Sequence, residues 1–190
     1  MPISELILVS GDDRQVPMLR SFVACLGLGA AAVALAVTVP ARAAAAPSAR
    51  PAAHEAQALL AGLNAIRRAH GLKPFGLSAQ LSRAAVAHAG SMAAKGYFDH
   101  DSADGTPWDD RIARYYPWAK TARLAENILW APDSAGPGAM IHTWMASHGH
   151  RANILTAAFD EIGIGVVAKA AAPGVYEGRD VEIAVTDFAG

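Results

Sequence analysis

Apolar residues recur at helical spacing in two early parts of the chain. Residues 54–70 place apolar side chains three or four positions apart until Gly71 and Pro74 end the pattern, which predicts an amphipathic helix. Ser78 can cap a second helix that ends at Gly96. The apolar stripe of this second helix consists of Leu81, Ala85, Ala89, Met92 and Ala93. Both helices are therefore predicted to pack into the core.

Two shorter helices are predicted further along the chain. Thr106 can cap a short helix that has Pro107 at its first position and two acidic residues in its first turn. A fourth helix is predicted over residues 138–147. Its inward face is predicted to consist of Ile141, Trp144 and Met145.

The periodicity changes to alternation towards residue 190. Two segments alternate apolar residues with small or polar ones, which predicts two strands; these residues are Ile162, Ile164 and Val166, and then Val181, Ile183 and Val185. The turn residues Pro173-Gly174 and Glu177-Gly178 lie between the two strands and predict their connection. Several helices around a few mostly antiparallel strands indicate an α+β fold, in which a sheet lies between helices.

An apolar segment near the start follows neither period. Residues 21–39 carry no charge, Arg20 precedes them, and Pro40-Ala41-Arg42-Ala43 follows. A basic start, an apolar stretch and an Ala-x-Ala exit predict that residues 1–43 are a signal peptide region and that the protein is exported, to the periplasm or out of the cell. The acidic residues before Met18 are atypical of a signal peptide, so translation is predicted to start at Met18. The alternative is an uncleaved membrane anchor.

The rest of the chain is predicted to hold one domain. Residues 44–53 are rich in Ala and Pro and have too little apolar bulk to bury, so they are predicted to be a disordered linker before a single domain over residues 54–190. The only cysteine, Cys25, lies in the signal peptide region, so a processed protein forms no disulfide. A net charge of -1 over 190 residues offers no basic surface to nucleic acid. Contact with a membrane is expected only in transit, through the signal segment.

Three separate stretches carry the residue types of a metal or acid/base site. His100 follows two aromatic anchors in a tight loop, and a neutral imidazole is a good zinc ligand. Glu126 lies in a mostly apolar run, where an acid must be paired or hydrogen-bonded. Each residue also has a plainer interpretation, in which His100 bonds the backbone of its loop and Glu126 with Asn127 ties neighbouring loops together.

The third stretch, residues 144–155, contains two histidines, an arginine and an asparagine. Gly149 lets the chain turn sharply, so His150 is predicted to lie on a loop, and His148 would face the same way as His150 in an extended chain. A site made by His142, His148 and His150 together is an alternative. The remaining histidines are predicted to be surface or helix-end residues; they are His54, His70 and His88.

The order of these motifs resembles the bacterial branch of the CAP superfamily, the SCP-like relatives of cysteine-rich secretory proteins, antigen 5 and plant pathogenesis-related proteins. The resemblance extends from about residue 54 to residue 188. Its motifs include Tyr97-Phe98-Asp99-His100, Ala125-Glu126-Asn127-Ile128, the stretch from Trp144 to Leu155, and Val185-Thr186-Asp187-Phe188. The resemblance implies a three-layer α-β-α sandwich with a central cleft, in which two histidines can hold a divalent cation, often zinc, beside one or two glutamates.

Carried over by position, the resemblance implies that His100 and His150 are the metal ligands and that Glu126 is the glutamate. The residues expected to support the cleft are Glu126, Asn127, Ser147, His148 and Arg151. The second glutamate of eukaryotic relatives is missing, because Ser147 stands three residues after Trp144, and no nucleophile is evidently paired with a base. The expected function is therefore a non-catalytic extracellular module that binds a divalent cation and a lipid, sterol-like or cell-envelope ligand.

Two alternatives remain open at this point. One is a metal-assisted hydrolase of peptides or cell-wall material, in which Glu126 acts as the base toward a cation-bound water. The other is a purely structural domain whose histidines only fasten loops.

Overall fold

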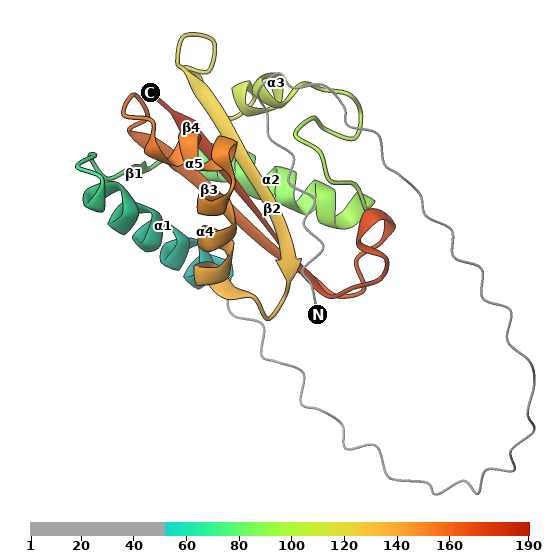
Figure 1. Ribbon diagram of the computed structural model, residues 1–190. Coiled ribbons are helices and arrows are strands. Elements are labelled where there is room, and N and C mark those ends of the chain that lie inside the picture. Colours follow the sequence, from blue (N-terminus) through green and yellow to red (C-terminus); the bar gives the residue numbers. More distant parts are fainter. Residues whose placement is uncertain (1–51) are drawn as a thin grey trace, which may run out of the picture. The chain divides into compact units, whose positions relative to one another are not determined.

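The computed structural model describes residues 52–190, which form five α-helices and four strands with one short 3-10 helix (Figure 1). The helices are α1 (Ala52–Ala69), α2 (Ala79–Lys95), α3 (Trp108–Ala113), α4 (Gly136–Ala146) and α5 (His148–Leu155), and η1 is Gly174–Tyr176. The strands are β1 (Gly76–Leu77), β2 (Leu124–Pro132), β3 (Glu161–Lys169) and β4 (Val181–Ala189). The predicted signal peptide region, the start at Met18 and nearly all of the predicted linker lie outside the described residues. No helix within residues 52–190 has the length and apolarity needed to cross a membrane.

The four strands form one sheet in the order β1-β3-β4-β2. Strand β4 pairs antiparallel with both β3 and β2, and only the two-residue β1 pairs in parallel, with β3. The prediction of a mostly antiparallel sheet is thus confirmed. Strand β2 was not expected from the sequence, and it occupies one edge of the sheet.

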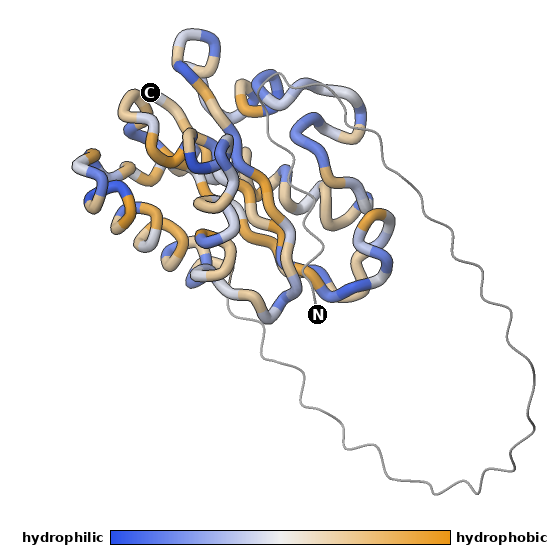
Figure 2. The backbone as a smooth tube through the Cα atoms, in the orientation of Figure 1, coloured by the Kyte–Doolittle hydropathy of each residue, from blue (hydrophilic) through white to orange (hydrophobic). Residues whose placement is uncertain are grey.

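Helices cover both faces of the sheet, which confirms the three-layer α-β-α sandwich (Figure 1). On one face, α1 packs on apolar side chains of β3 such as Ile162 and Ile164, and α4 and α5 pack on β2. On the other face, α2 packs on Ile183 and Val185 of β4. Figure 2 shows that the central strands are among the most hydrophobic parts of the backbone, as expected for strands that are buried from both sides.

Two glycines of β3 let α2 approach the sheet closely. Gly163 and Gly165 face this helix, and a Cβ atom at either position would collide with the backbone of α2 near Leu81 or Ala85. Glycine is therefore needed here for close approach of two backbones, and not for an unusual φ angle. Because α2 lies so close, the loop that follows it is brought to the end of the sheet where β2 begins.

The helices differ from the sequence predictions in detail. The helix expected over residues 54–70 begins two residues earlier, at Ala52. The third helix begins at Trp108 with Pro107 in the N-cap position, so Thr106 is not its cap. In α4 the buried face is formed by Met140 and Trp144, while Ile141 and Met145 are only partly buried. This helix packs against both α1 and the unforeseen strand β2, so its buried stripe is shifted from the predicted one.

Candidate functional site

A buried network of charged groups joins the loop after α2, the strand β2 and the helix α3. The Nδ1 atom of His100 lies 2.7 Å from Oε1 of Glu126, and Nη2 of Arg111 donates a hydrogen bond to Oε2 of the same carboxylate. Nη2 of Arg111 also lies 3.4 Å from the carbonyl oxygen of His100. All three side chains are at most 8% exposed. Two cationic or polar partners thus hold both oxygens of one buried carboxylate.

This environment keeps Glu126 ionised. Burial alone would raise the pKa of Glu126, but the hydrogen bond from His100 and the positive charge of Arg111 outweigh it, so the pKa lies below its ordinary value. A carboxylate with a lowered pKa and both oxygens engaged is a weak proton acceptor. The side chain is well placed to orient His100 and poorly placed to act as a base.

A second carboxyl group, that of Asp187, lies beside Glu126. The two residues are paired across β2 and β4, so their side chains point to the same face of the sheet. Burial raises the pKa of Asp187 well above its ordinary value, and the negative charge of Glu126 raises it further. The pKa values of the two carboxyl groups are therefore shifted in opposite directions, Glu126 down and Asp187 up, which is the usual result when two acids share a buried place.

The raised pKa of Asp187 predicts a pH effect on stability. The unfolded chain loses this proton near the ordinary pKa of 3.8, whereas the folded chain keeps it to higher pH. Between these two values the unfolded state binds fewer protons, so the free energy of unfolding falls as the pH rises. Asp187→Asn is expected to remove this decline, so that the variant gains stability relative to the parent as the pH rises above about 4. Urea unfolding at several pH values measures the difference, and identical pH profiles would contradict a raised pKa.

The prediction that His88 is a surface or helix-end residue is wrong. His88 lies in the middle of α2, is 1% exposed, and its Nε2 atom lies 2.9 Å from the carbonyl oxygen of Asp99. Burial lowers the pKa of His88 to about 4, so the ring is neutral at pH 7. It anchors the loop that carries His100. The prediction is right for His54 and His70, which are exposed.

The third predicted stretch approaches β2 from the opposite face. Nδ2 of Asn127 donates to the carbonyl oxygen of His150 at 3.1 Å, and Nδ2 of Asn153 donates to Oδ1 of Asn127 at 2.8 Å. The side chains of Glu126 and Asn127 point to opposite faces because they are neighbours on a strand. His100 and His150 are therefore attached to adjacent residues of β2 from its two sides.

The segment around His150 is a helix, and the predicted loop is wrong. Residues His148–Leu155 form α5, with Ser147 at its N-cap position and its carbonyl oxygen accepting from the N–H of Arg151. Histidines two apart on a helix point in different directions, so His150 is buried at 2% exposure while His148 and Arg151 are exposed. Of the residues expected to support the cleft, Glu126, Asn127 and Ser147 are buried. His142 is exposed on α4, apart from the buried His150.

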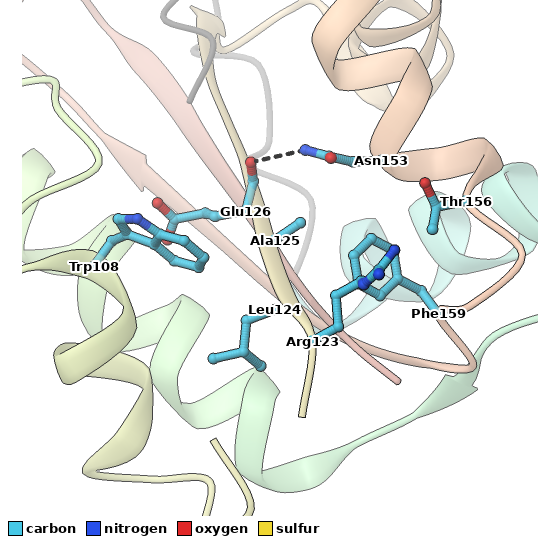
Figure 3. Close-up of a pocket in the computed structure, with 8 residues that line it drawn as sticks. All are labelled: Trp108, Arg123, Leu124, Ala125, Glu126, Asn153, Thr156 and Phe159. Atoms are coloured by element: carbon cyan, nitrogen blue, oxygen red, sulfur yellow. Dashed lines mark hydrogen bonds between the residues drawn. The ribbon is translucent and has the colours of Figure 1, made fainter. Parts of the chain in front are cut away.

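A pocket of about 250 Å³ lies at the start of β2, beside this network (Figure 3). Its walls are Trp108 on the α3 side and Asn153, Thr156 and Phe159 on the other side, and its floor is the strand from Arg123 to Glu126. The backbone N–H and C=O groups of Arg123 are both hydrogen-bonded to Gly190. In an antiparallel pair of strands, such hydrogen-bonded residues alternate with residues whose N–H and C=O groups point the other way. The backbone N–H and C=O groups of Leu124 and Glu126 therefore point away from the neighbouring strand. The carbonyl oxygen of Glu126 accepts from Asn153 at 3.3 Å. The pocket thus combines two aromatic side chains, Trp108 and Phe159, with polar groups and the backbone of an edge strand.

Three residues of this site were not assigned from the sequence. Arg111, Asp187 and Trp108 come from different elements, and only tertiary packing brings them to Glu126 and the pocket. The one available signal was indirect: an acid in an apolar run requires a buried partner, and an arginine is the most suitable one.

The residues present fit a divalent cation only in part. When Nδ1 of His100 donates to Glu126, Nε2 carries the lone pair, which is the arrangement found for metal-binding histidines oriented by a carboxylate. Within residues 52–190, however, no three His, Cys, Asp or Glu side chains are grouped so that they could hold a metal ion. The ligands expected from the sequence, His100 and His150, contact neighbouring residues of β2 in different ways: His100 bonds Glu126 through its ring, and His150 accepts from Asn127 through its backbone carbonyl oxygen.

Comparisons with known proteins agree with this fold. The family model of the cysteine-rich secretory protein family, CAP, matches residues 60–176, which is more than half of the chain. The protein YkwD of Bacillus subtilis, described as uncharacterised, is 41% identical over 105 residues, which cover 55% of this chain and 39% of YkwD. The chain thus spans well under half the length of this curated relative.

Solved structures give the same result. An extracellular protein of Bacillus anthracis that contains an SCP domain is 26% identical with a TM-score of 0.56, over 73% of this chain and 41% of that one. An outer surface protein of Borrelia burgdorferi is 16% identical with a TM-score of 0.58, over 72% of this chain and 92% of that one. A cysteine-rich secretory protein of Staphylococcus aureus is 20% identical with a TM-score of 0.51, over 73% of this chain and 38% of that one.

Proposed function

This chain belongs to the CAP, or cysteine-rich secretory protein, family, and from that premise we propose that it is an exported, non-catalytic binding module. Its site is the buried network of His100, Glu126 and Arg111 together with the pocket at the start of β2. Export is supported by the predicted signal peptide and by the descriptions of two similar structures as extracellular and outer-surface proteins.

The observation that carries the proposal is the engagement of Glu126. Ion pairs buried this deeply contribute little net stability, because desolvation offsets the attraction between the charges. Charged groups with shifted pKa values beside a pocket are therefore more often found at functional sites than in ordinary cores. Since Glu126 is held by two partners and has a lowered pKa, the function it supports is positioning of His100 for binding.

The same engagement argues against the hydrolase alternative. A base that activates water needs an oxygen available to accept the proton, whereas both oxygens of Glu126 are occupied by His100 and Arg111. No serine or threonine of the pocket stands beside a histidine, and Thr156 donates its hydroxyl to the carbonyl oxygen of Ala152. Hydrolysis of peptide or cell-wall substrates that is lost in Glu126→Gln would reverse this conclusion.

The size of the pocket supports one class of ligand over the other. Sites for whole drug-sized or sterol-sized molecules usually measure about 300–1,000 Å³, and the pocket at 250 Å³ is smaller. It suits one unit of an extended polymer, with Trp108 and Phe159 as apolar contacts and the backbone of Leu124 as a hydrogen-bonding edge. We therefore favour a peptide or glycan segment of the cell envelope over a lipid or sterol. Failure to bind any panel of envelope fragments would remove this part of the proposal.

A divalent cation, with zinc as the first candidate, is proposed to bind through His100 and His150. When bound it would supply a Lewis-acidic centre that attracts an oxygen of the ligand. In calorimetric titration of the purified full chain, zinc is expected to bind at one site. Loss of a residue that only orients a metal ligand costs about 10- to 100-fold in affinity, so His100→Ala/His150→Ala, which removes the ligands themselves, is expected to weaken binding by at least about a hundredfold.

The matched control is His142→Ala/His148→Ala, which removes two exposed histidines from neighbouring helices. It is expected to bind zinc like the parent. Equal zinc binding by both double variants, or none by the parent, would overturn the cation proposal.

A further inference from the structure

The sheet has two sides on which strand pairing ends, and the structure treats them differently. Along β2, the side chain of Asn153 donates to the outward carbonyl oxygen of Glu126 at 3.3 Å. The indole of Trp144 donates to that of Ile128 at 3.5 Å, and Pro132 at the end of the strand has no N–H group. Proteins usually close sheet edges with such devices, because unpaired edges attract further strands.

The opposite side of the sheet is open along most of β3. Strand β1 pairs only with the first two residues of β3. Beyond them, Ile164 donates its N–H to Oγ of Ser82 at 3.2 Å, so the even-numbered residues of β3 direct their backbone groups away from β4. Within residues 52–190, the C=O of Ile164 and both backbone groups of Val166 and Ala168 have no hydrogen-bond partner. We call residues 164–168 the open edge.

Exposed apolar side chains flank the open edge. Val86 follows Ser82 by one turn of α2, so it lies on the same side of that helix, and a Cβ atom at Gly165 would meet its backbone. Leu77 of β1 pairs with Ile162, directly before the open edge. Val86 is 48% and Leu77 56% exposed, and they are two of the four large apolar residues that are exposed within residues 52–190. Unpaired backbone and exposed apolar groups therefore coincide here.

The open edge is complementary to itself. In an antiparallel pair of two copies centred on Val166, the two Val166 residues exchange backbone hydrogen bonds, and the N–H of each Ala168 donates to the C=O of Ile164 in the other copy. Pairing cannot extend further, because β1 occupies one end of this edge and the chain turns at Ala171, whose φ is 46°. Each copy thus presents the same short segment to the other, as a two-fold interface requires.

The charges of β3 match in the same register. Lys169 lies opposite Gly163 of the second copy, and Glu161 of that copy is its diagonal neighbour on the same face. Diagonal neighbours are within reach of long side chains, and opposite charges there attract. Glu161 accepts from the hydroxyl of Tyr116 through Oε2, which leaves Oε1 for the lysine. The two-fold symmetry repeats this attraction at both ends of the interface.

We propose that the open edge is the interface of a two-fold homodimer, in which β3 pairs antiparallel with β3 of a second copy. The proposal does not rest on the proposed function, because β2 and its pocket lie at the other side of the sheet (Figure 1). The register and the charges favour a second copy over an unrelated peptide. A dimer of this kind would present both pockets on its outer sides and would bind two units of one polymer together.

Sedimentation velocity of the full chain tests the proposal at about 1–500 µM, a range suited to interfaces of small area. The parent is expected to pass from monomer to dimer as the concentration rises. Ala168→Pro removes an N–H that makes no bond within the chain, so the fold is expected to tolerate it, and the Kd of the dimer is expected to rise at least about tenfold. Ala168→Ser keeps the N–H and is expected to dimerise like the parent. A monomeric parent, or equal dimerisation of all three proteins, would overturn the proposal.

A second pair of variants covers the case in which the proline variant does not fold. Val86→Arg places a charge beside the open edge and is expected to weaken the dimer at least about tenfold. Ala87→Arg is the matched control, since Ala87 is also exposed but lies on the side of α2 that faces α3. Equal dimerisation of the two arginine variants would contradict the interface.

Hydrogen exchange of single amides locates the interface directly. The amide proton of Ala168 is expected to exchange more slowly as the concentration rises, because it becomes bonded to the second copy. The outward amide proton of Trp130, on β2, is expected to exchange at the same rate throughout. Slowing at Trp130 alone, or at neither residue, would overturn the proposal.

Discussion

Replacing Arg67 by alanine is expected to lower the free energy of unfolding by about 4 kcal/mol, the largest single effect in this domain. Arg67 lies near the end of α1 and is 1% exposed. Its guanidinium donates to four backbone carbonyl oxygens, those of Lys73, Ile154, Thr156 and Phe159, at 2.7 to 3.0 Å. Without it, these oxygens would be buried next to a cavity and would lose their donors.

The position of Arg67 explains why the effect should be large. Two of its acceptors, Ile154 and Thr156, are at the end of α5, where helical carbonyl groups have no partner within the helix. The guanidinium also stacks on the ring of Phe75, 3.8 Å from its centre. One side chain therefore fastens α5, which carries His150, to α1.

Two variants separate this role from a general effect of charge. Arg68→Ala removes the exposed neighbour and is expected to change stability by less than about 0.5 kcal/mol. Arg67→Lys keeps the charge but lacks the planar fork, so it is expected to recover only part of the loss. Urea denaturation measures all three proteins. A loss of less than about 1 kcal/mol in Arg67→Ala would mean that water replaces the guanidinium without difficulty.

Glu126→Gln is expected to lower the free energy of unfolding by about 3 kcal/mol, since it leaves the charge of Arg111 buried without its counterion. Asp187 beside it is expected to compensate in part, because loss of the negative charge of Glu126 lowers the pKa of Asp187 and lets it ionise. Adding Asp187→Asn to Glu126→Gln should therefore destabilise further at pH 7, although Asp187→Asn alone is expected to stabilise. Such a change of sign is the signature of coupled groups.

The control for Glu126→Gln is the exposed ion pair of Glu177 and Arg179. Both of its side chains are at least half exposed, so Glu177→Gln is expected to change stability by less than about 0.5 kcal/mol. Chemical denaturation of Glu126→Gln and Glu177→Gln compares the loss of a buried glutamate with the loss of an exposed one, and each glutamate contacts an arginine in the parent. Equal small losses would show that the Glu126 network is open to water.

Much of the fold could be predicted because its signals are local. Apolar stripes and end signals located α1 and α2 to within a few residues, and alternation located β3 and β4. Strand β2 could not be recognised, since Glu126 and Asn127 interrupt its apolar pattern and serve the site. Gly149 suggested a loop, but it lies within the first turn of α5, where packing of Ile154 outweighs the cost of glycine.

The candidate site could be predicted only as a set of residue types. An acid in an apolar run correctly indicated that Glu126 is buried and paired, and the histidine bonded to it is His100. Its second partner, Arg111, and its neighbour Asp187 depend on the docking of α3 and on the register of β2 with β4, which no local pattern records. His88 was misjudged because its helix is buried along more of its circumference than the apolar stripe alone indicated.

The central claim is that the Glu126 network holds His100 for ligand binding together with His150. Anomalous diffraction at the zinc absorption edge, from crystals of the protein soaked in zinc, tests it most directly. The account predicts one peak bonded to His100 and His150, with Glu126 still bonded to Nδ1 of His100. A peak only at exposed histidines such as His142 or His148, or none on the domain, would contradict it.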